Sequence, residues 1–544
     1  MYVRDFLISK TALLLVPTIR IPVIVIAVAE VSAHPRIFFV IFCPKKQSTH
    51  TDIHSLERSF VAFFKPKSRP KLSSMTTESD EPLTPAGRLF LQPEMDTIIH
   101  LALGMKHPID IDSIKAFLKN SIMINHPRFC SLLVRDRRGR EYWRRTEVDI
   151  DRHVIVLDSP VTTPDSHGST SEAAVNEYLA GLAVSTPLSA EKPLWEIHLL
   201  RDQRCAIMRI HHALGDGISL MSMFLASCKR VDDPEALPRI PSGKSKQNET
   251  RNERRRRRRN WGEVLWGILM MVWFNLVFVV DFVLRSLWVC DNKTAVTGGA
   301  GVELWPRKLA TAKFLLEDMK LVKKAVPDAT INDVLFGVVS LGLSRYLEHR
   351  SPNAMLEGLR LTGLAMVNLR DQQGLQDVTE LMKNNSGTRW GNKFGMILLP
   401  VYYHKSGEDP LSYLKRAKSM IDRKKQSVEA HFSYKIGDLV MSLFGAKVAC
   451  LLNYRILCNT TFSISNVVGP QDEIAYAGNP ITFVRANSSS LPHALTMHMV
   501  SYVGMADMQI LVAKDIIPDP EFLAKCFEEA LLEMKEAAAA ITTF

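Results

Sequence analysis

The sequence predicts a two-domain fold of mixed helices and strands, and three observations support this prediction. Its 544 residues favour more than one domain, and 46% apolar with 23% charged residues is the composition of an ordinary packed protein. Segments with strand periodicity alternate with segments of helical periodicity on both sides of residues 241–300. Residues 241–300 themselves are first strongly basic and then strongly apolar. We therefore expect an α/β (α+β) chain in which this insertion separates two halves, residues 81–240 and 301–544.

The first half contains both kinds of element. Residues 111–122 carry apolar side chains at helical spacing, whereas residues 130–135 and 142–150 are strand-like runs. Residues 195–200 and 205–210 are apolar runs joined through Asp202 and Gln203, which predicts a β-hairpin. A helix is predicted next, over residues 217–229.

The second half opens with a long helical pattern over residues 330–347. Thr330 and Asp333 fit a capping box at its start. The remaining predicted elements are the strands 359–367, 462–467 and within 495–512, a basic helix over 409–426, and a final helix over 518–540 with a proline near its start.

Residues 1–80 do not have the pattern of a domain, and we expect an extension that is disordered or serves as an optional anchor. Residues 11–29 are apolar, but Arg20 interrupts them and Pro17 and Pro22 break the helical pattern. A signal peptide, a membrane anchor and an artefactual extension that ends before Met75 all remain open.

Charge and cysteine use exclude several classes of protein. The net charge is +11, but residues 1–74 carry about +7 and residues 241–260 another +7 (two Lys and seven Arg against two Glu), so the remainder is close to −3. Basic segments beside apolar runs fit an anionic membrane surface better than nucleic acid. The eight cysteines are scattered, without a C-x-x-C pair or zinc spacing, which predicts a reducing compartment, no disulfide framework and no metal site.

The segment His211-His212-Ala213-Leu214-Gly215-Asp216-Gly217 follows an apolar strand and precedes a helix. Its two glycines allow a tight backbone path around the aspartate, which can place a histidine ring at the mouth of a cleft. A neutral imidazole there can accept the proton of an alcohol that attacks a carbonyl carbon.

This HHxxxDG segment resembles the signature of CoA-dependent acyltransferases with the chloramphenicol acetyltransferase-like fold. Four more segments resemble, in the same order, elements of the wax ester synthase/diacylglycerol acyltransferase family: Pro193-Leu194-Trp195, Asn332-Asp333, Asn368-Leu369-Arg370 and Ser465-Asn466-Val467-Val468-Gly469-Pro470. The resemblance covers roughly residues 81–534 and implies a two-domain acyltransferase fold with its active-site channel between the halves. The DFGWG pentapeptide of plant acyltransferases of specialised metabolism is absent.

By this resemblance His212 is the general base, and His211 either supports it or only packs. Asp216 either holds the loop, with Arg370 as its partner, or orients the base as in a Ser-His-Asp triad. Gly217 is expected to serve close backbone packing.

The resemblance also implies three substrate-binding candidates. Asn466 would face the channel and donate to the developing oxyanion, although a strand-ending turn explains it equally. Asn332 and Asp333 would lie near the site, although Asp333 also fits the helix cap. Trp195 is expected in the core.

The implied function is that of an acyl-CoA-dependent O-acyltransferase. It would make wax esters from long-chain fatty alcohols, with triacylglycerol from diacylglycerol as an open addition. Acyl-CoA is a co-substrate, and no other cofactor or metal is implied. The alternatives are an acyltransferase for a soluble hydroxylated or amine acceptor, and a catalytically silent, membrane-bound lipid carrier.

Residues 254–290 are expected to bind a membrane surface. Residues 264–280 are uncharged, and as a helix they would extend ~26 Å, less than a hydrocarbon core of ~30 Å. A longer span would place Asp281 and Arg285 in lipid. Since His212 precedes this segment and Asn466 follows it, one crossing would divide the site. We expect an interfacial or re-entrant segment at the endoplasmic reticulum, with both halves cytosolic; the plasma membrane as a further location and a single span remain alternatives.

Overall fold

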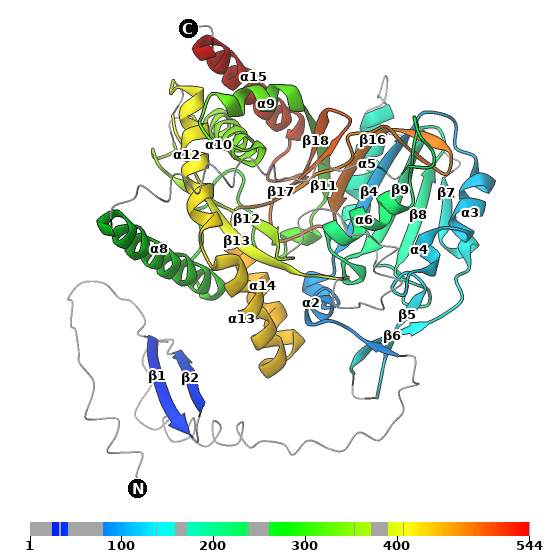
Figure 1. Ribbon diagram of the computed structural model, residues 1–544, viewed down its shortest axis with the longest axis horizontal. Helices are drawn as coiled ribbons and strands as arrows, with labels where there is room; N and C mark the ends of the chain where they lie inside the picture. Colours follow the sequence, from blue (N-terminus) through cyan, green and yellow to red (C-terminus); the bar gives the residue numbers. More distant parts are fainter. Residues whose placement is uncertain are drawn as a thin grey trace. The chain divides into compact units, whose positions relative to one another are not determined.

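The computed structural model describes residues 24–31, 34–41, 80–137, 139–157, 171–185, 187–236, 238, 261–352, 354–370, 390–405 and 407–542. The chain divides into two units, Met1–Met75 and Thr76–Phe544 (Figure 1). The described part of the first unit is a hairpin of β1 (Ile24–Val31) and β2 (His34–Ile41). The rest of the predicted extension up to residue 79, and the arginines at 254–259, lie outside the described residues.

A seven-stranded sheet forms the centre of the first half. The predicted hairpin is confirmed, because Trp195 pairs with Ile210 and Leu200 with Cys205. Two strands of this sheet come from beyond residue 470, so the second half of the sequence completes the sheet of the first. In spatial order the strands are β10 (Lys229–Arg230), β15 (Ile474–Tyr476), β16 (Asn479–Ser488), β4 (Ile98–Met105), β9 (Cys205–His211), β8 (Trp195–Leu200) and β7 (Val154–Leu157).

Smaller elements complete the first half. Trp195 is buried as predicted, and its indole N–H donates to the carbonyl of Phe129 at 2.9 Å. The strand predicted over 142–150 ends already at Arg145, and Ile150 begins a 3-10 turn. The elements are a sheet of β3 (Glu81–Pro82), β6 (Glu141–Arg145) and β5 (Ser131–Arg135), the helices α2 (Pro85–Leu89), α3 (Ile111–Lys119), α4 (Ile122–Asn125), α5 (Ser171–Ala183) and α6 (Gly217–Ala226), and the 3-10 turns η1 (Pro93–Met95), η2 (Ile150–Arg152) and η3 (His212–Leu214).

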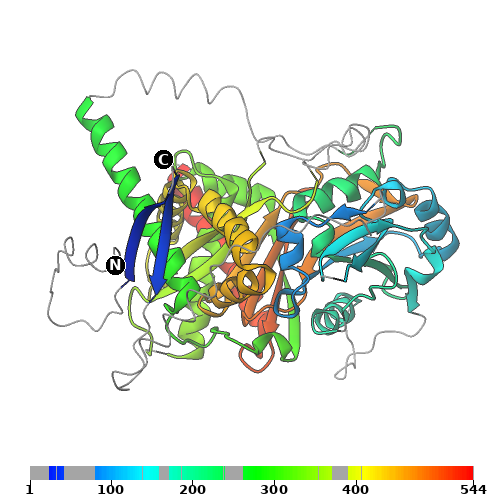
Figure 2. The ribbon, with the colours of Figure 1, turned by 90° about the horizontal axis from the view of Figure 1, so that it is seen from below.

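A six-stranded sheet forms the second half, and Figure 2 shows the two halves side by side. The predicted strand region 495–512 is a hairpin that turns at Val503 and Gly504, both with positive φ. In spatial order the strands are β11 (Arg307–Leu315), β18 (Met505–Ala513), β17 (Leu495–Tyr502), β14 (Phe462–Val467), β12 (Arg360–Asn368) and β13 (Phe394–Tyr402).

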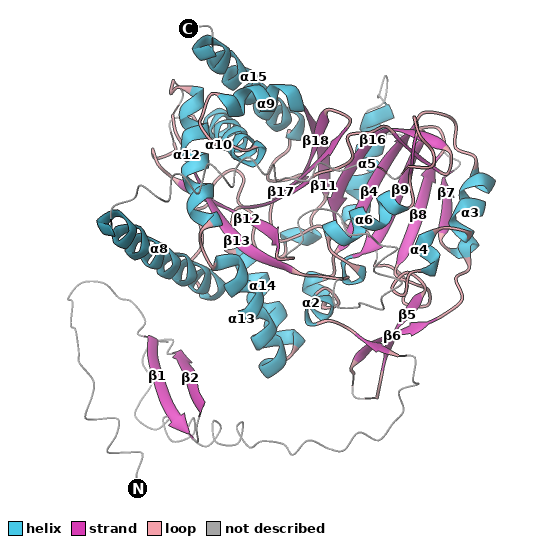
Figure 3. Cartoon of the chain, viewed as in Figure 1, coloured by secondary structure: helices cyan, strands magenta, loops and turns pink. Residues whose placement is uncertain are grey.

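Helices cover both faces of this second sheet (Figure 3). One apolar core joins the sheet to α9 (Leu316–Lys324), α10 (Ile331–Arg350), α12 (Pro410–Lys425) and α15 (Pro520–Thr542), and the 3-10 turn η4 (Val302–Leu304) precedes β11. A second core, with Phe282, Leu398 and Leu457, joins it to α8 (Trp261–Leu287), α13 (Glu429–Phe444) and α14 (Ala446–Cys458). Helices α13 and α14 were not predicted from the sequence.

Candidate active site

A cavity of about 270 Å³ lies between the two halves, and His212 forms part of its wall. Strand β9 ends at His211, so His212 stands at the end of a central strand, in the first turn of η3. Asn466 of β14 and His498 of β17 border the same cavity from the second half. Apolar side chains make up much of the remaining wall, among them Phe90, Met95, Met208, Leu364, Phe394 and Leu457.

The side chain of Asn392 determines which nitrogen of His212 carries the proton. Its amide nitrogen donates to the backbone carbonyl of His212 at 2.8 Å, which turns its amide oxygen toward the ring. That oxygen lies 3.0 Å from Nδ1 of His212 and can only accept, so Nδ1 carries the hydrogen. The Nε2 lone pair is therefore available to accept a proton.

Burial keeps this imidazole uncharged. It lowers the pKa of His212 to about 4, although the nearby Asp216 carboxylate acts in the opposite direction. The ring also stacks on Phe90, with the ring centroids 4.0 Å apart. His212 at neutral pH thus has the protonation state that a general base needs.

His211 does not border the cavity. Its Nδ1 accepts the backbone N–H of Ala213 at 3.1 Å, so its Nε2 carries the hydrogen and donates to Asp96 at 2.8 Å. These bonds hold the turn after β9, which favours the supporting interpretation of His211 over a direct one.

Asp216 links the two halves. Its Oδ2 accepts from the guanidinium of Arg370 at 2.7 Å and from the backbone N–H of Lys393 at 3.0 Å. Its Oδ1 caps α6 by accepting the N–H of Ser219 at 3.0 Å. The predicted pairing with Arg370 is therefore present, and the Asp216 carboxylate is engaged by these groups instead of by the ring of His212.

The packing prediction for Gly217 needs correction. A Cβ atom at this position would lie 3.7 Å from Cγ2 of Val467, an ordinary van der Waals distance, and no closer neighbour is present among the described residues. Gly217 borders the cavity instead, so a side chain there would occupy space beside His212.

The substrate-binding candidates separate into two groups. Asn466 borders the cavity and donates to the amide oxygen of Asn332 at 2.8 Å, so Asn332 stands behind it. Asp333 is fully buried in the predicted capping box, where it accepts the backbone N–H of Thr330 at 2.6 Å. The cap interpretation of Asp333 is thus confirmed, and its place in the wall of the cavity is not.

Two residues of the site, Asn392 and His498, were not predicted from the sequence. Asn392 follows Trp390-Gly391, a pair that indicates only a turn, and nothing in its spacing connects it with His212. His498 lies in an apolar strand, yet it borders the cavity and its buried Nδ1 has no hydrogen-bond partner in the described part of the chain. Burial lowers the pKa of His498 to about 4.

A group of ligand-type side chains lies elsewhere, where Glu357, His404 and Glu408 bring one ligand atom each within 4.8 Å of one another. His404 already contacts Glu357 at 2.5 Å, and Glu408 pairs with Arg416. The absence of a metal from the chemistry stays a prediction.

Two family models match the chain. The wax ester synthase/diacylglycerol acyltransferase catalytic domain matches residues 127–335, and the WS/DGAT C-terminal domain matches residues 390–535. Two curated proteins of Arabidopsis thaliana are similar to the chain over most of their length. Wax ester synthase/diacylglycerol acyltransferase 11 is 35% identical to this chain, and the match covers 86% of this chain and 97% of that protein. Wax ester synthase/diacylglycerol acyltransferase 5 is also 35% identical, and the match covers 84% of this chain and 94% of that protein.

Solved structures show the same fold at low identity. The wax ester synthase/diacylglycerol acyltransferase from Marinobacter aquaeolei VT8 has a TM-score of 0.52 and 17% identity, over 84% of this chain and 100% of its own. The TRI3 trichothecene 15-O-acetyltransferase from Fusarium sporotrichioides has a TM-score of 0.53 and 13% identity, and the match covers 87% of this chain and 100% of that chain. The predicted two-domain acyltransferase fold is thereby confirmed.

Proposed function

The chain belongs to the wax ester synthase/diacylglycerol acyltransferase family and is an acyltransferase, and from this we propose that it transfers a fatty acyl group from acyl-CoA to a lipid hydroxyl group. Long-chain fatty alcohols would give wax esters and diacylglycerol would give triacylglycerol. The observation that carries the proposal is the neutral His212, whose Nε2 is left without a proton by Asn392, in an apolar cavity between the halves.

The reaction requires only one proton carrier. Nε2 of His212 accepts the hydroxyl proton while the alcohol oxygen attacks the thioester carbonyl carbon. The tetrahedral intermediate collapses with cleavage of the carbon–sulfur bond, and the imidazolium returns its proton to the leaving CoA thiolate. Ester and free CoA are the products, so no acyl-enzyme and no cofactor besides the acyl-CoA co-substrate is needed.

Asn466 is placed to stabilise the intermediate. One hydrogen of its amide group binds Asn332 at 2.8 Å, which orients the amide beside the cavity. The second hydrogen can donate to the developing oxyanion, an interaction that typically lowers the barrier by about 3–4 kcal/mol.

The acceptors are lipids, and α8 supports a location at the cytosolic face of the endoplasmic reticulum membrane. Leu265–Leu287 contains an 18-residue stretch with a mean hydropathy of 2.3 and is long enough to cross a membrane. Arg285, however, is buried against the protein and pairs with Asp291 at 2.9 Å. This leaves residues 265–280 for contact with lipid, about 24 Å of helix against a hydrocarbon core of about 30 Å. We therefore place α8 in the interface, with residues 254–259 against anionic headgroups and no nucleic acid as partner.

The test is a comparison of acceptors. Purified protein is given palmitoyl-CoA with hexadecanol, with dioleoylglycerol, or with soluble hydroxylated and amine acceptors, and the products and released CoA are measured. Wax ester or triacylglycerol should form with equal release of CoA. Turnover of the soluble acceptors alone would refute the lipid assignment.

A further inference from the structure

Helices α13 and α14 meet at Gly445, where they expose a group of large apolar side chains. Leu443 is 66% exposed and Phe444 56%, although both lie on ordered helical backbone. With Leu439, Val448 and Leu451 they form what we call the apolar tip. Leaving such side chains in water is unfavourable, so an exposed cluster of this kind marks a contact surface.

The charges around the apolar tip are mostly positive. Lys435 and Lys447 are exposed on the two helices, against Asp438 as their exposed acidic residue. Apolar side chains with flanking cations fit an anionic lipid surface, in which the side chains enter the acyl region and the cations contact headgroups.

Helix α14 connects the apolar tip with the active site. Asn453 and Leu457 are four residues apart on one face of α14, and both border the cavity that contains His212. Val448 and Leu451 lie on the opposite, exposed face. One helix thus has the cavity on one side and the apolar surface on the other.

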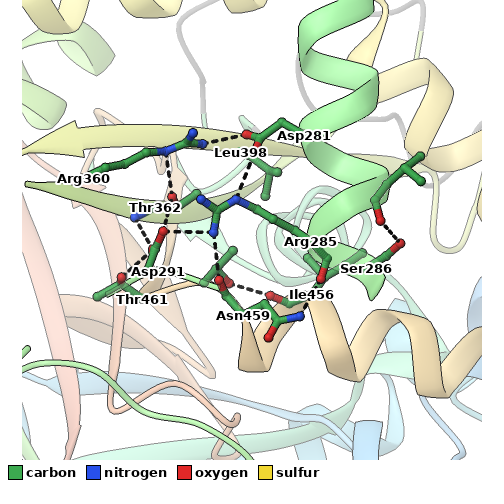
Figure 4. Close-up of polar contacts among 12 residues, drawn as sticks. Asp281, Arg285, Ser286, Asp291, Arg360, Thr362, Leu398, Ile456, Asn459 and Thr461 are labelled. Carbon is green, nitrogen blue, oxygen red and sulfur yellow. Dashed lines mark hydrogen bonds and ion pairs between the residues drawn. The ribbon is translucent and has the colours of Figure 1, made fainter. Parts of the chain in front are cut away.

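Helix α8 is held against α14 and the sheet by buried charges (Figure 4). Arg285 pairs with Asp281 at 3.2 Å and with Asp291 at 2.9 Å, and it donates to the carbonyl of Asn459, just beyond α14, at 2.8 Å. Asp281 in turn pairs with Arg360 of β12 at 2.6 Å.

The part of α8 before these contacts, residues 265–280, is called here the free part of α8. One of its faces touches the protein, where Asn275 accepts the backbone N–H of Val428 and Arg423 lies over the ring of Phe274, and the other face is apolar and exposed. Trp266, Leu269, Trp273 and Leu276 are between 55% and 65% exposed. The contacts of Arg285 and Asn275 fix α8 relative to α13 and α14 near the start of α13 and the end of α14, whereas the apolar tip lies at the opposite ends of these two helices.

We propose that the apolar tip and the free part of α8 are two separate contacts with the same membrane, and that the lipid acceptor reaches His212 from the bilayer along α14. This rests on the proposed function in one respect, that the acceptor is a lipid. It adds a second membrane contact, far from α8 in sequence, and the side from which the acceptor enters.

The test uses the double variant Leu443→Gln/Phe444→Gln in the full chain. Binding is measured by co-sedimentation with phosphatidylcholine vesicles that contain dioleoylglycerol, with and without phosphatidylserine. Removing two apolar side chains that would enter the acyl region should weaken binding about tenfold or more. Esterification of the vesicle dioleoylglycerol should fall in proportion, while esterification of octanol, which is offered in solution, should be retained. The matched control is Leu315→Gln/Leu532→Gln, with similarly exposed leucines at the end of β11 and in α15; it should behave as the unmodified protein.

Unchanged vesicle binding by the double variant would overturn the membrane surface. Loss of binding with full esterification of dioleoylglycerol would overturn the route along α14. A change from dimer to monomer in size-exclusion chromatography, with vesicle binding retained, would assign the apolar tip to contact between two copies. Failure of the unmodified protein to esterify any lipid would instead refute the proposed function, since vesicle binding is measured without turnover.

Discussion

Asn392 holds His212 at two points, through Nδ1 of the ring at 3.0 Å and through the backbone carbonyl at 2.8 Å. The two residues are 180 positions apart and belong to different halves of the chain. The proton-accepting nitrogen of His212 is therefore available only when the halves are assembled, which couples the chemistry to the fold.

Replacement of His212 by alanine should lower ester formation ~10²–10⁴-fold, equivalent to about 3–5 kcal/mol of barrier, because the general base is lost. Initial rates with palmitoyl-CoA and hexadecanol measure the effect. His211→Ala is the matched control and should cost less, since His211 binds Asp96 outside the cavity. The opposite order of effects would transfer the role of base to His211.

Substitution of Asn392 should change the pH profile as well as the rate. In Asn392→Asp a carboxylate faces Nδ1 and favours the imidazolium, so the pKa of His212 should rise from its value of about 4. The acid limb of kcat/KM should then move upward by about 1–2 pH units. Asn392→Leu removes the bond without adding charge and should lower kcat without this upward shift. An unchanged acid limb in Asn392→Asp would contradict the positioning role.

Asp216→Asn should reduce thermal stability together with activity. The carboxylate and Arg370 are both buried, and breaking a buried ion pair costs about 3–5 kcal/mol. Because Arg370 also donates to the carbonyl of Gly391 and to the hydroxyl of Ser219, it would not be left unpaired, and we expect a loss of stability near the lower end of this range. The melting temperature is the readout. A large fall in kcat at unchanged melting temperature would favour the catalytic orientation of His212 by Asp216.

The protein should lose stability as the pH falls below about 6.5. Burial lowers the pKa values of His100, His126 and His493 to about 3. In the unfolded chain these groups bind a proton near pH 6.5, so their contribution is complete above that pH and is lost as the pH falls toward 3. Each adds a slope of up to about 1.4 kcal/mol per pH unit. Urea unfolding at pH 7 and at pH 5 measures the change in the free energy of unfolding. This change should be smaller in His493→Gln than in the unmodified protein.

Glycosylation tags test whether α8 crosses the membrane. Acceptor sites inserted near Ser242 and at the C-terminus should both stay unmodified in endoplasmic reticulum membranes, because both halves contribute to one site. Modification of the C-terminal tag alone would establish a crossing by α8 and refute the interfacial placement.

Local patterns were enough to predict several elements of this chain. The hairpin of β8 and β9, the limits of α12 and the capping box of Thr330 and Asp333 agree with expectation, since each depends on residues close together in sequence. The HHxxxDG segment likewise indicated that His212 borders the cavity, while its role as general base stays a prediction. Such patterns report burial periodicity and caps, which neighbouring residues determine.

Contacts between distant segments were decided by the tertiary structure alone. Periodicity gave no indication that β15 and β16 complete the first sheet, that Asn392 reaches His212, or that Arg285 is buried and paired with Asp281. The sequence by itself determined the type of chemistry, because that resides in one short segment. Which nitrogen of His212 is free depends on packing between segments more than a hundred residues apart, where burial and hydrogen-bond geometry select the partner.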